Sequence, residues 1–405
     1  MEKKNKNLSI RWFYMIIGVI AMLFAGVLYA WSILKSPLSA EFGWGASHLA
    51  LNFTLAMTFF CIGGLLGAQI SKRKGHKIAL IMSGVLSALG FILTAMLNNT
   101  SVVMLYITYG VLAGLGIGIS YNVVIATVSA WFLDKKGLCS GCLMMGFGSS
   151  ALVLGNLADG MFKSTLGWRT TYMILGVSIF FVITISGFLL KSPKLTELPS
   201  SEAKKKTAEV DSHKDFTTVN MLCQPSFWMA FICISFLAAV GSSVISFAKD
   251  LAVSVKAPEG LAVSLVGVLS VCNGIGRILT GAVFDVIGRR KTMLLANILT
   301  ICAALVTLIS VSAGSLTLCI IGLCLTGMSY GSCPTITAAF TSSFFGMKHF
   351  SDNMAVMTFT VMVGSFIATA SNKVLEITGG YTGAFIMLLI LTFVALALNI
   401  FIRES

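Results

Sequence analysis

The stretch VCNGIGRILTGAVFDVIGRR (residues 271–290) places one arginine inside a long apolar run that ends in a cluster of charges. Residues 263–276 carry no charge, and the next charged residue after Arg277 is Asp285. An apolar run over 262–285 is long enough to cross about 30 Å of hydrocarbon. The stretch therefore predicts a membrane-spanning helix that holds a permanent cation near its middle.

The composition extends this prediction to the rest of the chain. The 405 residues are 57% hydrophobic and only 11% charged, and the mean hydropathy is +0.93. A soluble protein of this length could not cover its surface with so few charges. The apolar runs are solid rather than alternating, which favours helices over a β-barrel in lipid. We predict an all-α membrane protein with twelve spans, at 13–34, 48–70, 78–97, 102–130, 138–162, 168–190, 226–247, 262–285, 291–312, 315–341, 353–375 and 380–402.

The basic residues predict the orientation of these spans. When both chain ends and every even-to-odd connection are placed inside, 21 of the 28 Lys and Arg lie in inside segments and six lie in outside segments. This is the bias that the positive-inside rule describes. We therefore expect a multi-pass protein of the cytoplasmic membrane with both termini in the cytoplasm. The topology and contact with anionic membrane lipid explain the net charge of +13, so no nucleic-acid partner is expected.

One long polar segment divides the chain. Residues 191–220 mix charges of both signs with two prolines, which is typical of a flexible linker. We predict an amino-terminal six-helix bundle over residues 1–190, a cytoplasmic linker over 191–222 and a carboxyl-terminal six-helix bundle over 223–405.

The two halves share short matches at nearly constant spacing. The matches are Trp12 with Trp228 (216 residues apart), GISY at Gly118–Tyr121 with GMSY at Gly327–Tyr330 (209) and Gly75 with Gly288 (213). Such spacing predicts a duplicated six-span unit and thus two pseudo-symmetric bundles around a central cavity. In such an arrangement one bundle rocks against the other and exposes the cavity to each side in turn.

The end of the opening stretch carries a family signature. GAVFDVIGRRK (Gly281–Lys291) resembles the loop motif of the major facilitator superfamily: Gly, three residues, Asp, two residues, Gly and then basic residues. The resemblance implies the two-bundle fold and a gate on the cytoplasmic side. The first-half copy, SKRKGHK (Ser71–Lys77), has Lys72 where the acid belongs, so we expect the gate to depend on the second copy. The expected gating residues are Asp285, Gly288, Arg289, Arg290, Arg73 and Gly75.

A narrower resemblance covers nearly the whole chain. GVLYAWSILKSPLSAEFGW (Gly26–Trp44), the segment Tyr109–Gly148 and NGIGRILTG (Asn273–Gly281) are similar to the oxalate:formate antiporter family, which is close to the monocarboxylate transporters. This resemblance implies a carrier of carboxylates with an arginine in its eighth span, which is Arg277 here.

The position of Arg277 supports a binding role on physical grounds. It lies about 5 Å along the axis from the middle of its span, where an unpaired charge costs about 2.5–3.5 kcal/mol on insertion scales. No Asp or Glu lies deep in any predicted span, so the cation requires an anion from outside the protein. A guanidinium binds a carboxylate through two parallel hydrogen bonds. A structural ion pair is the alternative interpretation.

Four polar residues are candidates to complete the site. Asn273 lies one turn before Arg277 and can hold the guanidinium, bind a substrate oxygen or simply link two helices. Tyr121 and Tyr330 occupy the matched GISY and GMSY segments, and we expect their hydroxyls to line the cavity from opposite halves. Tyr29 in the first span is a weaker candidate. For each tyrosine the alternative is a buried phenol bonded to a backbone carbonyl.

The number of cations in the cavity decides between a monoanion and a dianion. Lys373 is the other cation within a predicted span, and it lies toward the outer end. The oxalate member of the family has a deep lysine in span eleven, and the matching position here is Met362 or a neighbour. One deep cation favours a monoanion, unless Lys373 reaches the cavity.

We therefore expect secondary transport of small monocarboxylates of the lactate, pyruvate or formate type, coupled to protons or driven by exchange. An oxalate:formate-type antiporter is one alternative, and a carboxylate sensor that has the fold but does not transport is another. The sequence shows no nucleophile–base pair and no cysteine spacing typical of a metal site, so neither an enzyme, a cofactor nor a metal is expected.

Overall fold

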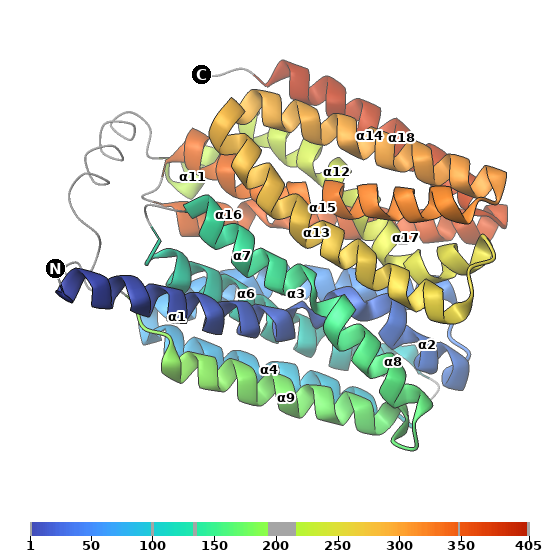
Figure 1. Cartoon of the computed structure of the whole chain (residues 1–405), viewed down its shortest axis with the longest axis horizontal. Helices are drawn as coiled ribbons and strands as arrows, with labels where there is room; N and C mark the ends of the chain where they lie inside the picture. Colours follow the sequence, from blue (N-terminus) through green and yellow to red (C-terminus); the bar gives the residue numbers. More distant parts are fainter. Residues whose placement is uncertain (1, 99–100, 133–135, 193–215, 347–348, 403–405) are drawn as a thin grey trace.

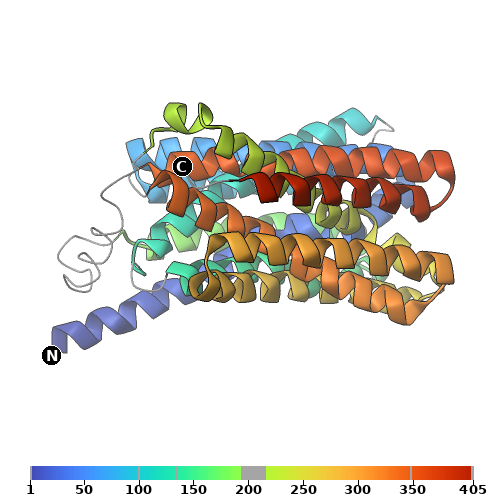
Figure 2. The same cartoon turned by 90° about the horizontal axis from the view of Figure 1, so that it is seen from above.

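A computed structural model describes residues 2–98, 101–132, 136–192, 216–346 and 349–402. In these ranges the chain forms helices and no strand. Twelve segments of the described chain are long and apolar enough to cross a membrane, which confirms the all-α, twelve-span prediction. The helices run roughly along one direction (Figure 2) and lie in two bundles, one formed by each half of the chain (Figure 1).

The amino-terminal bundle contains six spans, three of which are built from more than one helical segment. In chain order its elements are α1 (Glu2–Ala25), the 3₁₀ segment η1 (Gly26–Ala30), α2 (Trp31–Phe42), α3 (Ala46–Lys74), α4 (His76–Ala95), α5 (Val102–Leu105), the π-helical η2 (Tyr106–Ala113), α6 (Gly114–Ser129), α7 (Lys136–Gly148), the π-helical η3 (Ala151–Gly155), α8 (Asn156–Lys163) and α9 (Gly167–Leu189).

The carboxyl-terminal bundle has longer uninterrupted helices. Its elements are α11 (Thr218–Leu222), α12 (Pro225–Ser254), α13 (Glu259–Ile287), α14 (Arg289–Ala313), α15 (Leu316–Phe345), α16 (Phe350–Met357), α17 (Phe359–Thr378) and α18 (Tyr381–Phe401). Most of the predicted linker, residues 193–215, lies outside the described part of the chain. The described start of α1 and the end of α18 lie at one end of the molecule, called the terminal end below (Figure 1).

Two spans continue well beyond the predicted boundaries. The first span reaches Phe42 instead of residue 34, and the seventh reaches Ser254 instead of residue 247. Both predictions ended where charged residues begin, at Lys35 and at Lys249. In these extensions Lys35 of one bundle pairs with Asp250 of the other, as described below.

Close glycine contacts relate the two bundles by a constant spacing. In each bundle the second span packs against the fourth, as α3 against α6 and as α13 against α15. A Cβ atom on Gly118 would lie 2.0 Å from the carbonyl oxygen of Phe60, and one on Gly331 would lie 2.1 Å from that of Asn273. Both residues of the first contact are 213 positions before those of the second. Two further contacts repeat with the same spacing. The contact of Gly114 with Ala56 corresponds to that of Gly327 with Leu269, and the contact of Gly63 with Leu115 corresponds to that of Gly276 with Met328.

This spacing corrects one prediction from the sequence. The match of GISY with GMSY implied a spacing of 209 and made Tyr121 and Tyr330 equivalent. The contacts pair Gly118 with Gly331 instead, so the position equivalent to Tyr121 is Pro334. The four-letter match is wrong by about one helical turn, because small residues recur every turn along a tightly packed helix face.

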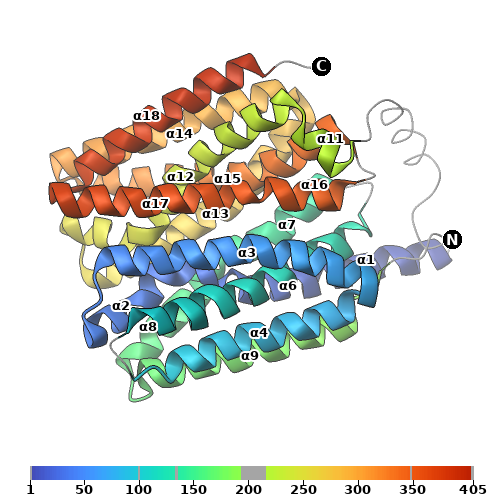
Figure 3. The same ribbon diagram turned by 180° about the vertical axis from the view of Figure 1, so that it is seen from behind.

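The bundles meet along two helix pairs. The amino-terminal α3 packs against α17, and α7 packs against α13 (Figures 1 and 3). The Thr54 hydroxyl of α3 donates to the carbonyl oxygen of Ser365 in α17 at 2.7 Å. These contacts enclose the space in which the candidate site lies.

Candidate functional site

A break in the first span positions Tyr29. The segment η1 interrupts the span, and Gly26 at its start contacts η3 and α7 of the fifth span. A Cβ on Gly26 would lie 2.0 Å from the carbonyl oxygen of Phe147, so only glycine allows this approach. The Tyr29 ring then packs edge-on against Phe147 and Tyr330, with centroids 5.0 and 5.8 Å apart.

Arg277 is buried and all its described hydrogen-bond partners are uncharged. Its side chain is 1% exposed. Nε donates to Oδ1 of Asn273 at 3.0 Å, and the two terminal nitrogens donate to the carbonyl oxygen of Met144 at 3.1 Å and to the hydroxyl of Tyr29 at 3.4 Å. None of the ion pairs among the described side chains involves Arg277. The alternative of a structural ion pair therefore has no support in this part of the chain.

The partners of Arg277 extend its contacts into both bundles. Met144 and Tyr29 belong to the amino-terminal bundle, whereas Asn273 lies on the same helix as Arg277. The Tyr29 hydroxyl in turn donates to the Tyr330 hydroxyl at 3.4 Å. Asn273 is fully buried, and its Nδ2 has no hydrogen-bond partner.

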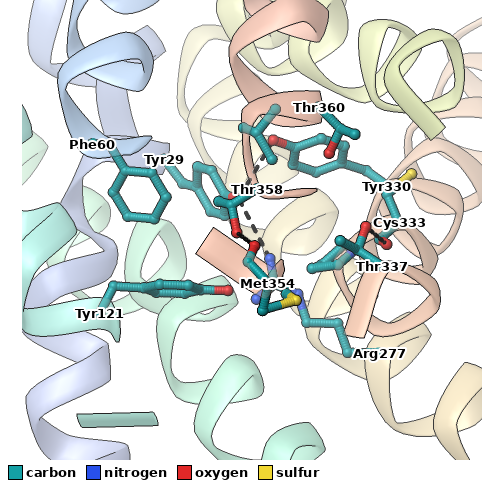
Figure 4. A pocket seen from close by; sticks show the side chains of 12 residues that line it. Tyr29, Phe60, Tyr121, Arg277, Tyr330, Cys333, Thr337, Met354, Thr358 and Thr360 are labelled. Atoms are coloured by element: carbon teal, nitrogen blue, oxygen red, sulfur yellow. Dashed lines mark hydrogen bonds between the residues drawn. The ribbon is translucent and has the colours of Figure 1, made fainter. Parts of the chain in front are cut away.

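A cavity opens in front of the guanidinium (Figure 4). Its free space is small, about 20 Å³, which is enough for roughly one water molecule. Its walls are Tyr29, Phe60, Tyr121, Arg277, Tyr330, Cys333, Pro334, Thr337, Met354, Thr358, Thr360 and Val361. Of these, Tyr29, Phe60 and Tyr121 come from the amino-terminal bundle and the rest come from the carboxyl-terminal bundle, so the cavity lies between the bundles.

The structure brings most of the predicted site residues together. Arg277, Tyr121, Tyr330 and Tyr29 all line the cavity, and Asn273 lies behind Arg277 as its partner. Lys373 is exposed on α17 and is not among the lining residues.

Apart from Tyr330, the sequence interpretation missed the lining residues that α15 and the α16–α17 span supply. Val361, the neighbour of Met362, lines the cavity near the position that the family resemblance gives to a lysine, and the hydroxyls of Thr337, Thr358 and Thr360 were not predicted. Threonines are frequent in these spans, so nothing in the sequence distinguishes them. A proline inside α15, Pro334, was the one available signal.

The predicted gating residues lie at the terminal end. Gly75 and Gly288 end α3 and α13 with positive φ of 87° and 76°, which favours glycine. The Arg289 guanidinium lies over the Phe344 ring at 3.9 Å. Arg73 and Arg290 are exposed. The side chain of Asp285 lies outside the described part of the structure.

An ion pair across the bundles was not predicted. Lys72, which replaces the acid of the family motif, donates to both carboxylate oxygens of Asp352 in α16 at 2.7 and 2.9 Å. The first-half copy therefore contacts the other bundle through a base instead of an acid, whereas the sequence led us to expect that the gate depends on the second copy.

A second set of contacts joins the bundles at the opposite end. The Lys35 ammonium of α2 donates to Asp250 of α12 and to the carbonyl oxygen of Ser246, each at 3.0 Å. That carbonyl lies directly before the kink of α12 at Phe247, where φ is −130°. The backbone N–H of Ser47 donates to Glu376 of α17 at 2.8 Å. The cavity thus lies between closures at both ends.

Comparison with known proteins agrees with this architecture. The model of the Major Facilitator Superfamily matches residues 14–369 and, in a second match, 231–405. The chain belongs to the Major Facilitator Superfamily. It is therefore a multi-pass membrane protein of a family of transporters.

Two relatives are similar over most of their length. An uncharacterized MFS-type transporter of Escherichia coli (strain K12), YhjX, is 28% identical over 358 residues, which are 88% of this chain and 86% of that protein. The oxalate:formate antiporter of Oxalobacter formigenes is 27% identical over 399 residues, which are 97% of this chain and 91% of that protein. Monocarboxylate transporter 12 of Xenopus laevis is 27% identical over a shorter region, 54% of this chain and 50% of that protein.

Proposed function

We propose that this transporter exchanges small monocarboxylate anions of the lactate, pyruvate or formate type across the cytoplasmic membrane. The observation that carries the proposal is the buried guanidinium of Arg277, which faces a cavity between the bundles and has only uncharged partners among the described residues. A charge at this depth is costly unless an anion neutralises it. The names of two relatives, an oxalate:formate antiporter and a monocarboxylate transporter, support a carboxylate as that anion.

The hydrogen bonds of Arg277 leave N–H donors for a carboxylate. A guanidinium has five N–H donors, and three are used by Asn273, Met144 and Tyr29. About two donors therefore remain, which is what one carboxylate needs. The Tyr121 hydroxyl, on the cavity wall, can add a further donor.

The charge of the cavity favours a monoanion. Among its lining residues Arg277 is the only charged side chain. Lys373 is exposed elsewhere on α17, so a dianion such as oxalate would leave one charge without a partner in the described cavity. A carrier of monoanions is therefore favoured over an oxalate:formate-type antiporter.

The closures at the two ends supply the gates of alternating access. Two ion pairs join the bundles at opposite ends, Lys72 with Asp352 and Lys35 with Asp250. In each pair the lysine belongs to the amino-terminal half and the aspartate to the carboxyl-terminal half. Partly exposed ion pairs contribute little free energy each, on the order of 0–1 kcal/mol, so one can open while the other stays closed. We place the terminal end, with Arg289 stacked on Phe344, on the cytoplasmic side.

Exchange is favoured over proton symport by the same neutral partners. A proton-coupled carrier needs a titratable group that senses the substrate. Among the described residues, Arg277 contacts an amide, a carbonyl and a phenol. With no carboxylate there to take up a proton, the substrate anion itself provides the counter-charge, and its return requires another anion.

Uptake of labelled L-lactate into proteoliposomes tests the proposal. We expect uptake into vesicles preloaded with unlabelled lactate, little uptake into empty vesicles, and a loss of at least about 100-fold in Arg277→Gln, since a charge-assisted bidentate contact is removed. Arg277→Lys keeps the charge without the fork and is expected to retain a small part of the activity.

The control is Arg169→Gln, which removes an arginine that is paired with Glu41 away from the cavity. All three variants are compared with the unaltered protein by thermal unfolding, so that loss of the fold is separated from loss of transport. Uptake driven by a proton gradient into empty vesicles would contradict exchange. Carboxylate binding without any flux would contradict a transport role and favour the sensor.

A further inference from the structure

Two threonine hydroxyls give the cavity a chemical character that Arg277 does not explain. Thr337 projects from α15, and Thr358 stands at the junction of α16 and α17; both line the cavity (Figure 4). Thr337 is 2% exposed. The Cys61 thiol of the other bundle donates to the Thr358 carbonyl at 3.4 Å, which ties this junction to α3.

Both hydroxyl protons are already committed. The Thr337 hydroxyl donates to the carbonyl oxygen of Cys333, and the Thr358 hydroxyl donates to that of Met354, each at 2.8 Å. A hydroxyl has one donor and two acceptor lone pairs. These two side chains therefore present only acceptors to a ligand, unless the ligand breaks a bond to the helix backbone.

The donors of the cavity come from other residues. Arg277 keeps about two N–H groups, and the Tyr121 hydroxyl on the cavity wall is a further donor. The walls thus combine donors suited to a carboxylate with acceptors suited to a group that carries a proton. A 2-hydroxy acid has both parts, whereas a 2-oxo acid places a second acceptor against the threonine oxygens.

We propose that Thr337 and Thr358 make the cavity selective for 2-hydroxymonocarboxylates over the matching 2-oxo acids. This inference rests on the proposed carboxylate transport and assigns its substrate class. The hydroxyl of the bound acid donates to a threonine oxygen. An oxo acid binds only when a threonine hydroxyl leaves its backbone carbonyl, a bond of ordinary strength.

Competition between matched acids tests the assignment. The pairs are lactate with pyruvate and 2-hydroxybutyrate with 2-oxobutyrate, each differing by two hydrogens, as inhibitors of labelled lactate exchange. We expect the hydroxy acid of each pair to bind about 3- to 10-fold more tightly, which is the worth of one neutral hydrogen bond.

Variants assign the effect to the threonines. Thr337→Val and Thr358→Val keep the shape of the side chain and remove the acceptor oxygen. The ratio of the affinities for the hydroxy acid and the oxo acid should therefore fall toward one, because the hydroxy acid binds more weakly. Thr337→Ser keeps the hydroxyl and should keep the preference. The control Thr171→Val removes a buried threonine with the same type of backbone bond, to Gly167, away from the cavity.

The outcomes separate this inference from the proposed function. Exchange that depends on Arg277 but shows equal affinity for both acids, or a preference that survives both valine variants, overturns the threonine assignment and leaves carboxylate transport in place. Absence of any Arg277-dependent carboxylate exchange overturns the proposed function and this inference with it. Thermal unfolding of each variant identifies losses caused by misfolding.

Discussion

At the scale of single residues, Asn273 controls how much charge Arg277 can offer to an anion. Its Oδ1 accepts from the Arg277 Nε at 3.0 Å, so it orients the guanidinium without neutralising it. The amide nitrogen of the same side chain is buried without a partner, a cost of about 1–3 kcal/mol. A charged carboxylate at this position would remove that cost and would also compete with the substrate.

Asn273→Asp should therefore weaken transport although it adds only a charge. An aspartate within hydrogen-bond distance of Arg277 forms an internal ion pair, and we expect the KM for lactate exchange to rise by roughly 10-fold or more. Asn273→Ala, which loses the bond without adding charge, is the comparison and should raise KM less. A KM unchanged in Asn273→Asp would show that the charge of Arg277 does not hold the substrate.

The sequence predicted these deep polar residues and the three tyrosines, but not the threonines of the cavity. An arginine inside an apolar span is rare and expensive, so Arg277 and the residue one turn before it were identifiable without a structure. Thr337 and Thr358 were not, because a threonine that bonds its own helix backbone, such as Thr307, looks the same in a sequence. Only the position of a helix relative to the other bundle distinguishes them.

At the scale of elements, irregular segments rather than regular helices position the site. The first span changes to a 3₁₀ segment at Gly26–Ala30 and the fifth to a π-helical segment at Ala151–Gly155, and these two segments contact each other. Tyr29 lies inside the first of them. Hydrophobic periodicity located the spans but contains no signal for such breaks, which arise from close contact between backbones.

Gly26→Ala tests the role of this contact. The added Cβ would lie 2.0 Å from the Phe147 carbonyl oxygen, so the two spans must separate at a cost of about 1–3 kcal/mol. We expect a lower unfolding temperature and a reduced exchange rate, because Tyr29 moves away from Arg277. Gly160→Ala in α8, where an added Cβ meets nothing within 4 Å, is the control and should change neither.

At the scale of the whole molecule, both ends of the cavity are closed by contacts between the bundles. Each end has one lysine from the amino-terminal half and one aspartate from the carboxyl-terminal half: Lys72 with Asp352, and Lys35 with Asp250. The side chains of Lys35 and Asp250 are 10% and 55% exposed, and those of Lys72 and Asp352 are 50% and 31% exposed. The largely buried Lys35 also donates to the carbonyl oxygen of Ser246 at 3.0 Å, so the terminal end is expected to open with less work.

Reversing one charge at the terminal end should open that end. Lys72→Asp places two carboxylates together, and the loss of an exposed pair worth up to about 1 kcal/mol shifts the balance of states by about five-fold. We expect faster amide hydrogen exchange in α16 and slower lactate exchange, because the carrier spends more time open at one end. The double variant Lys72→Asp with Asp352→Lys restores the attraction and should return both rates to within about two-fold of those of the unaltered protein.

Lys163→Asp is the matched control, since its 2.8 Å pair with Asp159 lies within one helix and does not join the bundles. Unchanged hydrogen exchange of α16 in Lys72→Asp would mean that the pair does not hold this end closed.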